Sequence, residues 1–584
     1  MFVKQTHNKK TGRTNLSIVQ GYHDKERGHS RTKTIENLGY LDELQKIYED
    51  PKAHFDRVCQ ERNRQAKMEA AEYTIVARKD SVLPENSANR RNYGYIVILR
   101  ILAELGLDRF FVNRRQRTKI EFNTQAIMRL LVVSRILSPG SKQKAYNEKK
   151  RYFDFERGDM FKQEDVYRAL SHFATLDGDI QRLIHDRISK RYGRKTGIIY
   201  YDVTNYYFEI EKEDELRKKG VSKEHRPDPI VQMGMALDEE GLPISYEVFE
   251  GNESEKLHLR PMVSELVRNY DVGKVITVAD AAQNTGNNIY YIEKAGQKYV
   301  FSQSIRGGGK AFKKYVLDEK GYEWFGEEYK RKSQAEMRDI QVSFMKDGKE
   351  RKKTVSVEQR QIVFYSKKYA ERSRYKREIA LKKAKSIISN PGAYTRATAY
   401  GALKYIKNLV VDKETGELKA VEGVPCFDLD RVREEEEFDG YYAIVTNVYD
   451  EGENKGKFGD DAIIDIYHGL WRIEDSFRVT KSDLETRPVY LSREDRIRAH
   501  FLTCFISLVV LRLIEKKTGN VYSPAKLVEA MNNISCSSEG SNLFLFDYRD
   551  EVADALGRAF GIDFTKERLT RAEIKKNIGD AKKV

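Results

Sequence analysis

The pattern of apolar and polar positions changes several times along the chain and divides it into segments of different type. Residues 1–75 alternate apolar and polar positions in short runs and then become highly charged at helical spacing, which predicts a small sheet followed by a helix. Residues 76–196 repeat apolar positions at helical spacing between basic connections, so we expect a helical DNA-binding region there. Residues 518–584 predict a mainly helical C-terminus with a Ser/Asn-rich turn at 532–542.

The middle of the chain alternates strand-like and helical runs. In residues 197–304, three apolar runs joined by turns precede a helix, a strand, a second helix and a last strand. Antiparallel strands followed by parallel strands that alternate with helices form the element order of a ribonuclease H-like domain, an α/β fold. Residues 305–455 interrupt this order with strand-like pieces and a very basic helix at 372–385, and residues 456–517 return to helices. The pattern therefore predicts a catalytic domain interrupted by a mainly β insertion domain.

Two of the expected strands end on an aspartate. The run that begins at Gly197 leads into Asp202, and the run that begins at Lys274 leads into Asp280. An apolar strand rarely carries a carboxylate at its tip without a cation or hydrogen-bond donors as partners. The expected sheet brings these strand ends side by side, so Asp202 and Asp280 are predicted to share a site.

A polar stripe lies later in the chain. Tyr467, Glu474 and Lys481 recur every seven residues, and seven residues are two helical turns, so one helix face is expected to carry all three. Trp471 and Phe477 would dock this helix on a core. A single glutamate on a helix is most simply a solvated charge. The two strand-end aspartates upstream instead make Glu474 a candidate third wall of a metal site.

Composition narrows the possible partners. The 584 residues include 105 Lys and Arg against 90 Asp and Glu, a net charge of +15 that favours a nucleic-acid partner over an ordinary basic enzyme. The four cysteines are far apart and show no CxxC pair, so neither a zinc site nor a disulfide framework is indicated. The start of the chain lacks the apolar run of a signal peptide, and the apolar segment 501–514 is too short to span a bilayer. We therefore expect a soluble, cytoplasmic, nucleoid-associated protein without a membrane partner.

These residues together resemble the DDE transposases of bacterial insertion sequences. The resemblance is to the group with a Tyr-x2-Arg-x3-Glu-x6-Lys signature and a β-rich insertion in the ribonuclease H-like domain. Asp202 and Asp280 match the first two acids, and Tyr467, Glu474 and Lys481 lie in the register of the signature. The chain departs from it at Leu470, which stands at the signature's Arg position, although Arg472 and Arg478 are close by.

The resemblance implies roles for these residues. It assigns catalysis and metal binding to Asp202, Asp280 and Glu474, and DNA binding to Tyr467, Arg472, Arg478 and Lys481. Carboxylate oxygens suit Mg²⁺, and two such ions, with Mn²⁺ as a substitute, promote in-line attack on a phosphodiester. Tyr467 has helix packing as its simpler explanation, and Lys481 that of a solvated cation favoured by the helix dipole.

The implied function is a transposase that binds the terminal inverted repeats of an insertion sequence and also target DNA. It cleaves duplex DNA and transfers strands, with excision through a hairpin intermediate, as a homodimer on paired ends. Two alternatives remain at this stage. One is another ribonuclease H-like nuclease or resolvase, and the other is a DNA-binding derivative that has lost catalysis.

Overall fold

The chain forms two compact units, Met1–Ser87 and Ala88–Val584, in the computed structural model. The structure describes residues 1–9, 12–24, 29–69, 80, 82, 85, 87–155, 160–220, 222–224, 226–395, 398–411, 417–421, 423–452, 455–540 and 542–583. The expected domain boundary at 75/76 lies outside the described residues.

The first unit has the expected sheet and helix. Its elements are β1 (Phe2–His7), β2 (Thr14–Asp24), β3 (His29–Tyr40), α1 (Leu41–Leu44) and α2 (Pro51–Glu69). The three strands form an antiparallel sheet in the order β1-β2-β3. Leu16, Ile18 and Val19 of the central strand are buried together with Cys59 of α2, so apolar side chains join the helix to the sheet.

The second unit begins with a helical bundle, as the hydrophobic spacing predicts. After the short strand β4 (Arg90–Asn92), its helices are α3 (Ile96–Glu104), α4 (Leu107–Gln116), α5 (Thr124–Leu137), α6 (Lys142–Asn147), α7 (Gln163–Ala174) and α8 (Asp177–Tyr192). The side chain of Asn123 accepts a hydrogen bond from the Ala126 N–H and starts α5, and Ser141 caps α6 in the same way. These helices pack around α16 (Glu494–Lys517), which contacts α3, α5 and α7.

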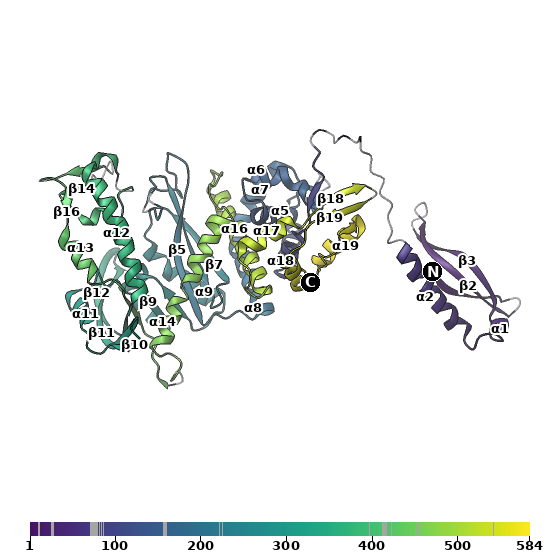
Figure 1. Cartoon of the computed structure of the whole chain (residues 1–584), viewed down its shortest axis with the longest axis horizontal. Coiled ribbons are helices and arrows are strands. Elements are labelled where there is room, and N and C mark those ends of the chain that lie inside the picture. The colour runs from purple at the N-terminus through teal and green to yellow at the C-terminus, as the bar shows by residue number, and fades with distance from the viewer. Residues whose placement is uncertain are drawn as a thin grey trace. The chain divides into compact units, whose positions relative to one another are not determined.

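A large mixed sheet forms the centre of the second unit (Figure 1). Its strand order is β10-β11-β12-β17-β9-β8-β5-β6-β7. The strands are β5 (Ile198–Tyr207), β6 (Ile230–Leu237), β7 (Pro243–Glu250), β8 (Ile276–Ala279), β9 (Lys298–Ser302), β10 (Glu323–Phe325), β11 (Tyr329–Lys346), β12 (Lys349–Ser366) and β17 (Tyr441–Thr446). β5, β6 and β7 pair antiparallel, whereas β5, β8 and β9 pair parallel. The predicted order of antiparallel and then parallel strands is therefore present.

Helices cover both faces of this sheet. Tyr201 and Val203 of β5 belong to a core with α9 (Leu259–Asn269) and α10 (Gly286–Lys294). Tyr200 and Tyr206 belong to the core on the other face, which includes residues of α14 (Asp460–His468), α15 (Trp471–Arg478) and α16. Successive residues of a strand point to opposite faces, so Asp202 lies on the α14–α15 face together with Tyr200.

The inserted segment differs from the expected self-contained, mainly β domain. The long hairpin β11–β12 joins the central sheet through β17. Ile340 and Val357 of this hairpin belong to the core that contains α9 and α10, which explains why the hairpin extends that sheet. The segment also contains α11 (Lys310–Leu317), α12 (Lys367–Ser389), α13 (Leu429–Glu436) and the short strands β13 (Ile406–Lys407), β14 (Leu409–Val411), β15 (Leu418–Ala420) and β16 (Cys426–Phe427).

The C-terminal region is less helical than expected. It contains α17 (Pro524–Asn533), β18 (Ser535–Gly540), β19 (Leu543–Phe546), α18 (Glu551–Phe560), β20 (Arg568–Thr570) and α19 (Arg571–Ala581). The Ser/Asn-rich stretch predicted as a turn includes β18, which pairs with β4 and β19. β4 lies more than 400 residues away in the sequence, and Ser535 of β18 pairs with its Asn92. This pairing gives the polar segment backbone hydrogen-bond partners that its sequence pattern did not indicate.

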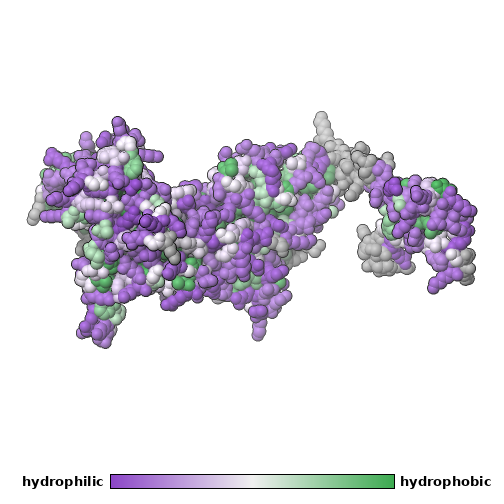
Figure 2. Space-filling model, turned by 90° about the horizontal axis from the view of Figure 1, so that it is seen from below, coloured by the Kyte–Doolittle hydropathy of each residue, from purple (hydrophilic) through white to green (hydrophobic). Residues whose placement is uncertain are grey.

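Helix α16 extends beyond the apolar segment 501–514 at both ends. Among the described residues it is the one helix long and apolar enough to cross a membrane by length and composition, but 89% of its apolar window is buried inside the fold. Its apolar side chains are therefore used in packing. The visible molecular surface is mostly hydrophilic, with scattered hydrophobic residues (Figure 2).

Candidate active site

Asp202 and Asp280 lie side by side at the sheet. β5 and β8 run parallel with Ile198 opposite Ile276 and Tyr200 opposite Val278. Continuing that register by two residues brings Asp202 level with Asp280, as expected from the sequence. Burial is the main cause that raises the pKa of Asp202, and the negative charge of the nearby Asp280 adds to the rise.

Asp202 is poorly solvated. Its side chain is 19% exposed. Burial raises its pKa to about 7, the nearby charge of Lys223 opposes this rise, and Asp280 and Glu255 increase it. Lys223 lies in the loop between β5 and β6, with its Nζ 3.8 Å from Asp202 Oδ1. A second cation would therefore stabilise the ionised form of Asp202.

Asp280 has a different local environment. It caps the 3₁₀ turn Ala281–Gln283, because its Oδ1 accepts a hydrogen bond of 3.0 Å from the Ala282 N–H. Glu255 lies in another 3₁₀ turn, Glu255–Leu257, and Gln283 Nε2 donates to its main-chain carbonyl at 3.2 Å. Burial and the charge of Asp280 raise the pKa of Glu255, while Lys223 opposes the rise. Three carboxylates thus influence one another at this edge of the sheet.

The predicted polar stripe is not on one helix. Tyr467 lies in α14, Glu474 in α15, and Lys481 in η9, a π-helical turn at Val479–Asp483. Because α15 passes directly into η9, Glu474 and Lys481 lie on one uninterrupted helical stretch, and only Tyr467 is set apart. The expectation of one helix for all three is wrong because the helix is interrupted at Gly469. A Cβ there would lie 2.0 Å from Tyr200 Oη, so only glycine allows the close approach of this junction to β5.

Tyr467 is near the aspartates and mostly buried. Burial raises its pKa to about 12, and the charges of Asp280, Tyr442 and Glu474 add to the rise, against a hydrogen bond with Ser302. Glu474 itself is exposed and forms no hydrogen bond or ion pair with any described residue. Tyr467 thus lies within electrostatic reach of both Asp280 and Glu474.

Lys481 is held in place by neighbouring side chains. Its Nζ donates to Glu224 Oε1 at 3.2 Å, and Glu224 also accepts from Arg487. Thr480 Oγ1 lies 2.9 Å from Tyr206 Oη, which attaches η9 to β5. Burial lowers the pKa of Lys481 to about 8, Lys223 lowers it further and Asp202 opposes this. The cation is therefore near Asp202 and only partly solvated.

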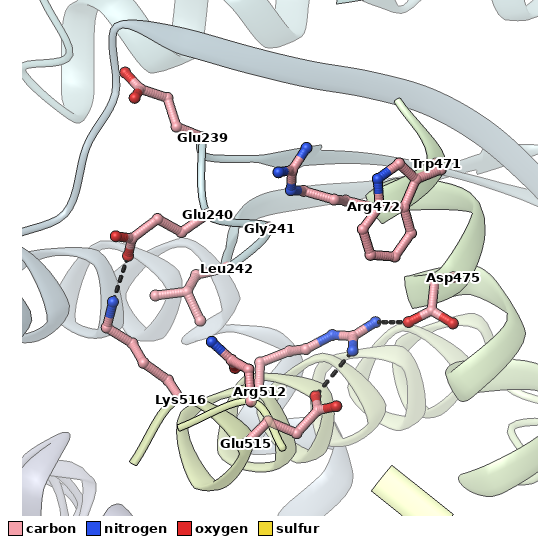
Figure 3. Close-up of a pocket in the computed structure, with 11 residues that line it drawn as sticks. Glu239, Glu240, Gly241, Leu242, Trp471, Arg472, Asp475, Arg512, Glu515 and Lys516 are labelled. Atoms are coloured by element: carbon pink, nitrogen blue, oxygen red, sulfur yellow. Dashed lines mark hydrogen bonds and ion pairs between the residues drawn. The ribbon is translucent and has the colours of Figure 1, made fainter. Parts of the chain in front are cut away.

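Arg472, on α15, lines a pocket that contains neither of the two aspartates. The pocket has a volume of about 490 Å³ and lies between α15, the β6–β7 turn and the end of α16 (Figure 3). The Arg472 guanidinium carbon is 5.5 Å from the ring centre of Trp471 and 5.6 Å from that of Tyr200. Arg472 forms no ion pair with a described residue, so its charge is available to an anion.

Arg478 is instead paired within the protein. It bonds to Asp475 Oδ1 at 2.9 Å, and Asp483 is 3.6 Å away. Asp475 also accepts from Arg512 of α16 at 2.7 Å, an interaction drawn in Figure 3. Burial opposes the ionisation of Asp475, but these two guanidinium groups outweigh it and hold its pKa below the ordinary value. Asp475 is thus committed to anchoring α15, whereas its neighbour Glu474 is free.

The donor set suits a hard divalent cation in part. Asp202 and Asp280 offer adjacent carboxylate oxygens in a region where anions are poorly solvated, which fits Mg²⁺. Among the residues that the structure describes, no three His, Cys, Asp or Glu side chains converge closely enough to hold a metal ion. The arrangement therefore pairs the first two acids, and Glu474 lies apart on α15.

Sequence reasoning missed Lys223, Glu224 and Glu255. All three lie in polar connections between elements, where a charged residue is ordinarily solvated. Their proximity to Asp202 or Lys481 follows from the path of the loops, and no spacing in the sequence indicates it.

Two family models match this chain. Residues 2–72 match the family model described as IS1634 family transposase, N-terminal domain, and residues 208–510 match that described as transposase DDE domain. No curated protein matches the chain. A solved structure, a cryo-EM structure of the piggyBac transposase synaptic complex with hairpin DNA, aligns over 84% of each chain at 8% identity and a TM-score of 0.35. A similarity at that level supports no conclusion about this chain.

Proposed function

Because the chain belongs to the transposase DDE domain family and is a DNA-cleaving and strand-transferring enzyme of insertion-sequence type, we propose which residues carry the reaction. Asp202, Asp280 and Glu474 are the three acids of the site. The observation that carries this proposal is the register of β5 and β8, which aligns the poorly solvated Asp202 with Asp280 at the neighbouring strand position. Glu474 is assigned by its place in the Tyr-Glu-Lys spacing and by its freedom from other partners.

The three acids would hold two Mg²⁺ ions, with Mn²⁺ as a substitute. When bound, the metal would activate the attacking oxygen and stabilise the leaving one. Asp202 would bind the metal as the carboxylate, since a nearby divalent cation favours its ionised form. Lys223 would partly neutralise Asp202 before the metal arrives, because its ammonium lies 3.8 Å away.

The remaining predicted residues would position DNA. Tyr467 and Lys481 would contact phosphates beside the cut, and Lys481 is oriented for this by Glu224 and η9. Arg472 would serve as a phosphate contact in place of the signature arginine that Leu470 replaces, since it has no carboxylate partner among the described residues. Arg478 is the weakest of these assignments, because Asp475 and Asp483 already engage it.

The substrate would be the terminal inverted repeats of the element and then target DNA, with excision through a hairpin. Two ends require two active sites, so the working form would be a homodimer, acting on nucleoid DNA in the cytoplasm.

Cleavage of labelled duplex DNA tests the proposal. The substrate is the sequence that flanks the gene on each side, incubated with purified protein and Mg²⁺. We expect Asp202→Asn, Asp280→Asn and Glu474→Gln each to abolish strand cleavage while mobility-shift binding persists. Asp475→Asn is the matched control on α15 and should still cleave. Full cleavage by Glu474→Gln would overturn the assignment of the third acid and make Asp475 or Glu485 the next candidate.

A mobility-shift experiment with two ends tests the assembly. We expect a slower complex that contains both ends when both duplexes are present. A nuclease or resolvase would cleave with the same acids and give no paired-end complex.

A further inference from the structure

Helix α12, in the inserted segment, carries an unusual excess of positive charge. Two of its nine basic residues are neutralised: Arg377 pairs with Asp439 at 2.6 Å, and Lys367 lies 3.7 Å from Glu328. The other seven form no ion pair with any described residue, and they are Lys368, Arg372, Arg374, Lys376, Lys382, Lys383 and Lys385. Only Glu371 and Glu378 carry negative charge on this helix.

These cations lie on the solvent side of α12. The buried residues Arg377, Ala384 and Ile387 mark its inner face. On the opposite face, Lys368, Arg372, Tyr375, Ile379 and Lys382 follow one another at helical spacings of three or four residues. Together they form a stripe about 21 Å long at a rise of 1.5 Å per residue. The remaining free cations flank this stripe on both sides.

An aromatic and an aliphatic side chain interrupt the charge along the stripe. Tyr375 is 65% exposed and Ile379 is 50% exposed. Cations four residues apart, such as Lys368 and Arg372, repel one another and destabilise an isolated helix. A polyanion with exposed sugar surface would satisfy both the charges and the apolar side chains.

The N-terminal turns of α12 adjoin the candidate active site. Tyr369 Oη is 3.4 Å from His468 Nε2, next to Tyr467, and the Tyr369 and Tyr442 rings are 4.8 Å apart. Ser373 lines a pocket of about 260 Å³ together with Tyr467 and with Ala281, which follows Asp280. The helix therefore starts at the site and continues into the inserted segment, where it contacts β16 (Figure 1).

The helix is also firmly held on its inner side. Asp439 accepts hydrogen bonds from both Arg377 of α12 and Arg306, and Ala384 and Ile387 belong to a small core with Tyr405. A charged surface on a fixed helix loses little conformational freedom when it binds a rigid partner.

We infer that the exposed face of α12 binds the sugar-phosphate backbone of the duplex DNA on which the carboxylate site acts. This inference rests on the proposed function, because the DNA on α12 is the substrate that Asp202 and Asp280 act on. Lys368, Arg372 and Lys382 are phosphate contacts, and Tyr375 and Ile379 contact deoxyribose. Because the contacts that we propose are to phosphate and sugar, they do not read the base sequence directly.

The salt dependence of DNA binding tests this surface. The variant replaces Lys368, Arg372 and Lys382 with alanine. The control replaces Lys526, Lys575 and Lys576 with alanine, which removes the same amount of charge. These three lysines are exposed on α17 and α19 and form no ion pair with a described residue. Binding of a mixed-sequence 40-base-pair duplex is measured by fluorescence anisotropy from about 50 to 200 mM KCl. We expect the slope of log K against log salt to fall by about 2.7 for the α12 variant, or 0.9 per lost phosphate, and to change little for the control.

Cross-linking locates the DNA on the helix. In a Cys426→Ser background, which removes the exposed cysteine, a photo-cross-linker is attached to Ile379→Cys or, as a control, to Lys576→Cys. The duplex should be captured from position 379 and not from position 576.

The possible outcomes separate this inference from the proposed function. If the wild type cleaves DNA but the α12 variant has the same salt slope as the wild type and the control, the role of α12 is refuted and the proposed function stands. If the wild type does not cleave, the proposed function fails, while the slopes still report whether α12 binds DNA. A change of oligomeric state in the α12 variant, measured by sedimentation, without a change of slope would make the face a contact between two copies of the chain and overturn the inference.

Discussion

Asp202→Asn is expected to stabilise the metal-free protein at the same pH at which we expect it to abolish cleavage. Burial raises the pKa of Asp202 to about 7 from the ordinary 3.8. The folded state therefore binds this proton more tightly than the unfolded state, and stability is lost as the pH rises from about 4 through 7. A difference of about three pKa units corresponds to a cost of about 4 kcal/mol for the ionised group at high pH.

The effect has a defined pH window. With these two pKa values, the free energy of unfolding of the wild type is expected to fall by about 2.5 kcal/mol between pH 5 and pH 8 because of this one group. Asparagine cannot ionise, so the free energy of unfolding of Asp202→Asn should lack this component. The assay is urea unfolding of both proteins at several pH values in the presence of a chelator. The gap between them should widen in favour of the variant as the pH rises.

The same Asp-to-Asn change on α15 gives the control. Asp475→Asn removes hydrogen bonds to Arg512 and Arg478, which hold the pKa of Asp475 low. It should therefore lose about 1.5–3 kcal/mol near neutral pH, the typical contribution of a hydrogen bond to a charged group. Parallel curves for the wild type and Asp202→Asn from pH 5 to 8 would refute the reasoning. Added Mg²⁺ should stabilise the wild type more than Asp202→Asn, because only the wild type offers the anionic ligand.

Three further substitutions test the surrounding framework. Glu104→Ala should cost about 3 kcal/mol in urea unfolding, because the Glu104 side chain is fully buried and lies 2.8 Å from Lys517; a neutral result would contradict this. Lys142→Met should gain stability relative to the wild type as the pH falls from 9 to 6. Burial lowers the pKa of Lys142 to about 7, so the amine of the folded wild type resists the protonation that the unfolded chain undergoes. Thermal unfolding of both proteins at the two pH values measures this difference. Tyr206→Phe should cost about 1 kcal/mol and slow DNA cleavage, since it frees the η9 turn from β5 by removing the 2.9 Å contact with Thr480; unchanged cleavage would show that the contact does not position Lys481.

The strands that carry the two aspartates could be predicted because their signal is local. Ile199, Tyr201 and Val203 are apolar and buried on one face, and the chain flanking Asp280 is equally apolar. Such runs indicate a buried strand whatever surrounds them. The helical bundle was predictable for the same reason. By contrast, the polar strand β18 has no apolar alternation. Its partner β4 is far away in the sequence, and the two strands meet only in the folded unit.

The charged loop residues could not be predicted from their own neighbourhood. Lys223 and Glu224 lie in a connection of mixed charge, where each has the ordinary explanation of a solvated side chain. Their contacts with Asp202 and Lys481 span 21 and 257 residues respectively. Long-range electrostatic contacts of this kind are set by topology, so they require the fold.

One strand sets the spacing of the whole candidate site. On the α14–α15 face of β5, Tyr200 meets Gly469 at the helix break, Asp202 faces Asp280, and Tyr206 bonds to Thr480 beside Lys481. A slip of one residue in the β5 register would send all three side chains to the opposite face. Tyr467, Glu474 and Lys481 are placed by separate contacts. α14 packs on β8 and β9, α15 packs on β5, and η9 is joined to β5 by the hydrogen bond between Thr480 and Tyr206. Glu474 is exposed on α15 and has no hydrogen-bond or ion-pair partner among the described residues, so no other contact holds its carboxylate.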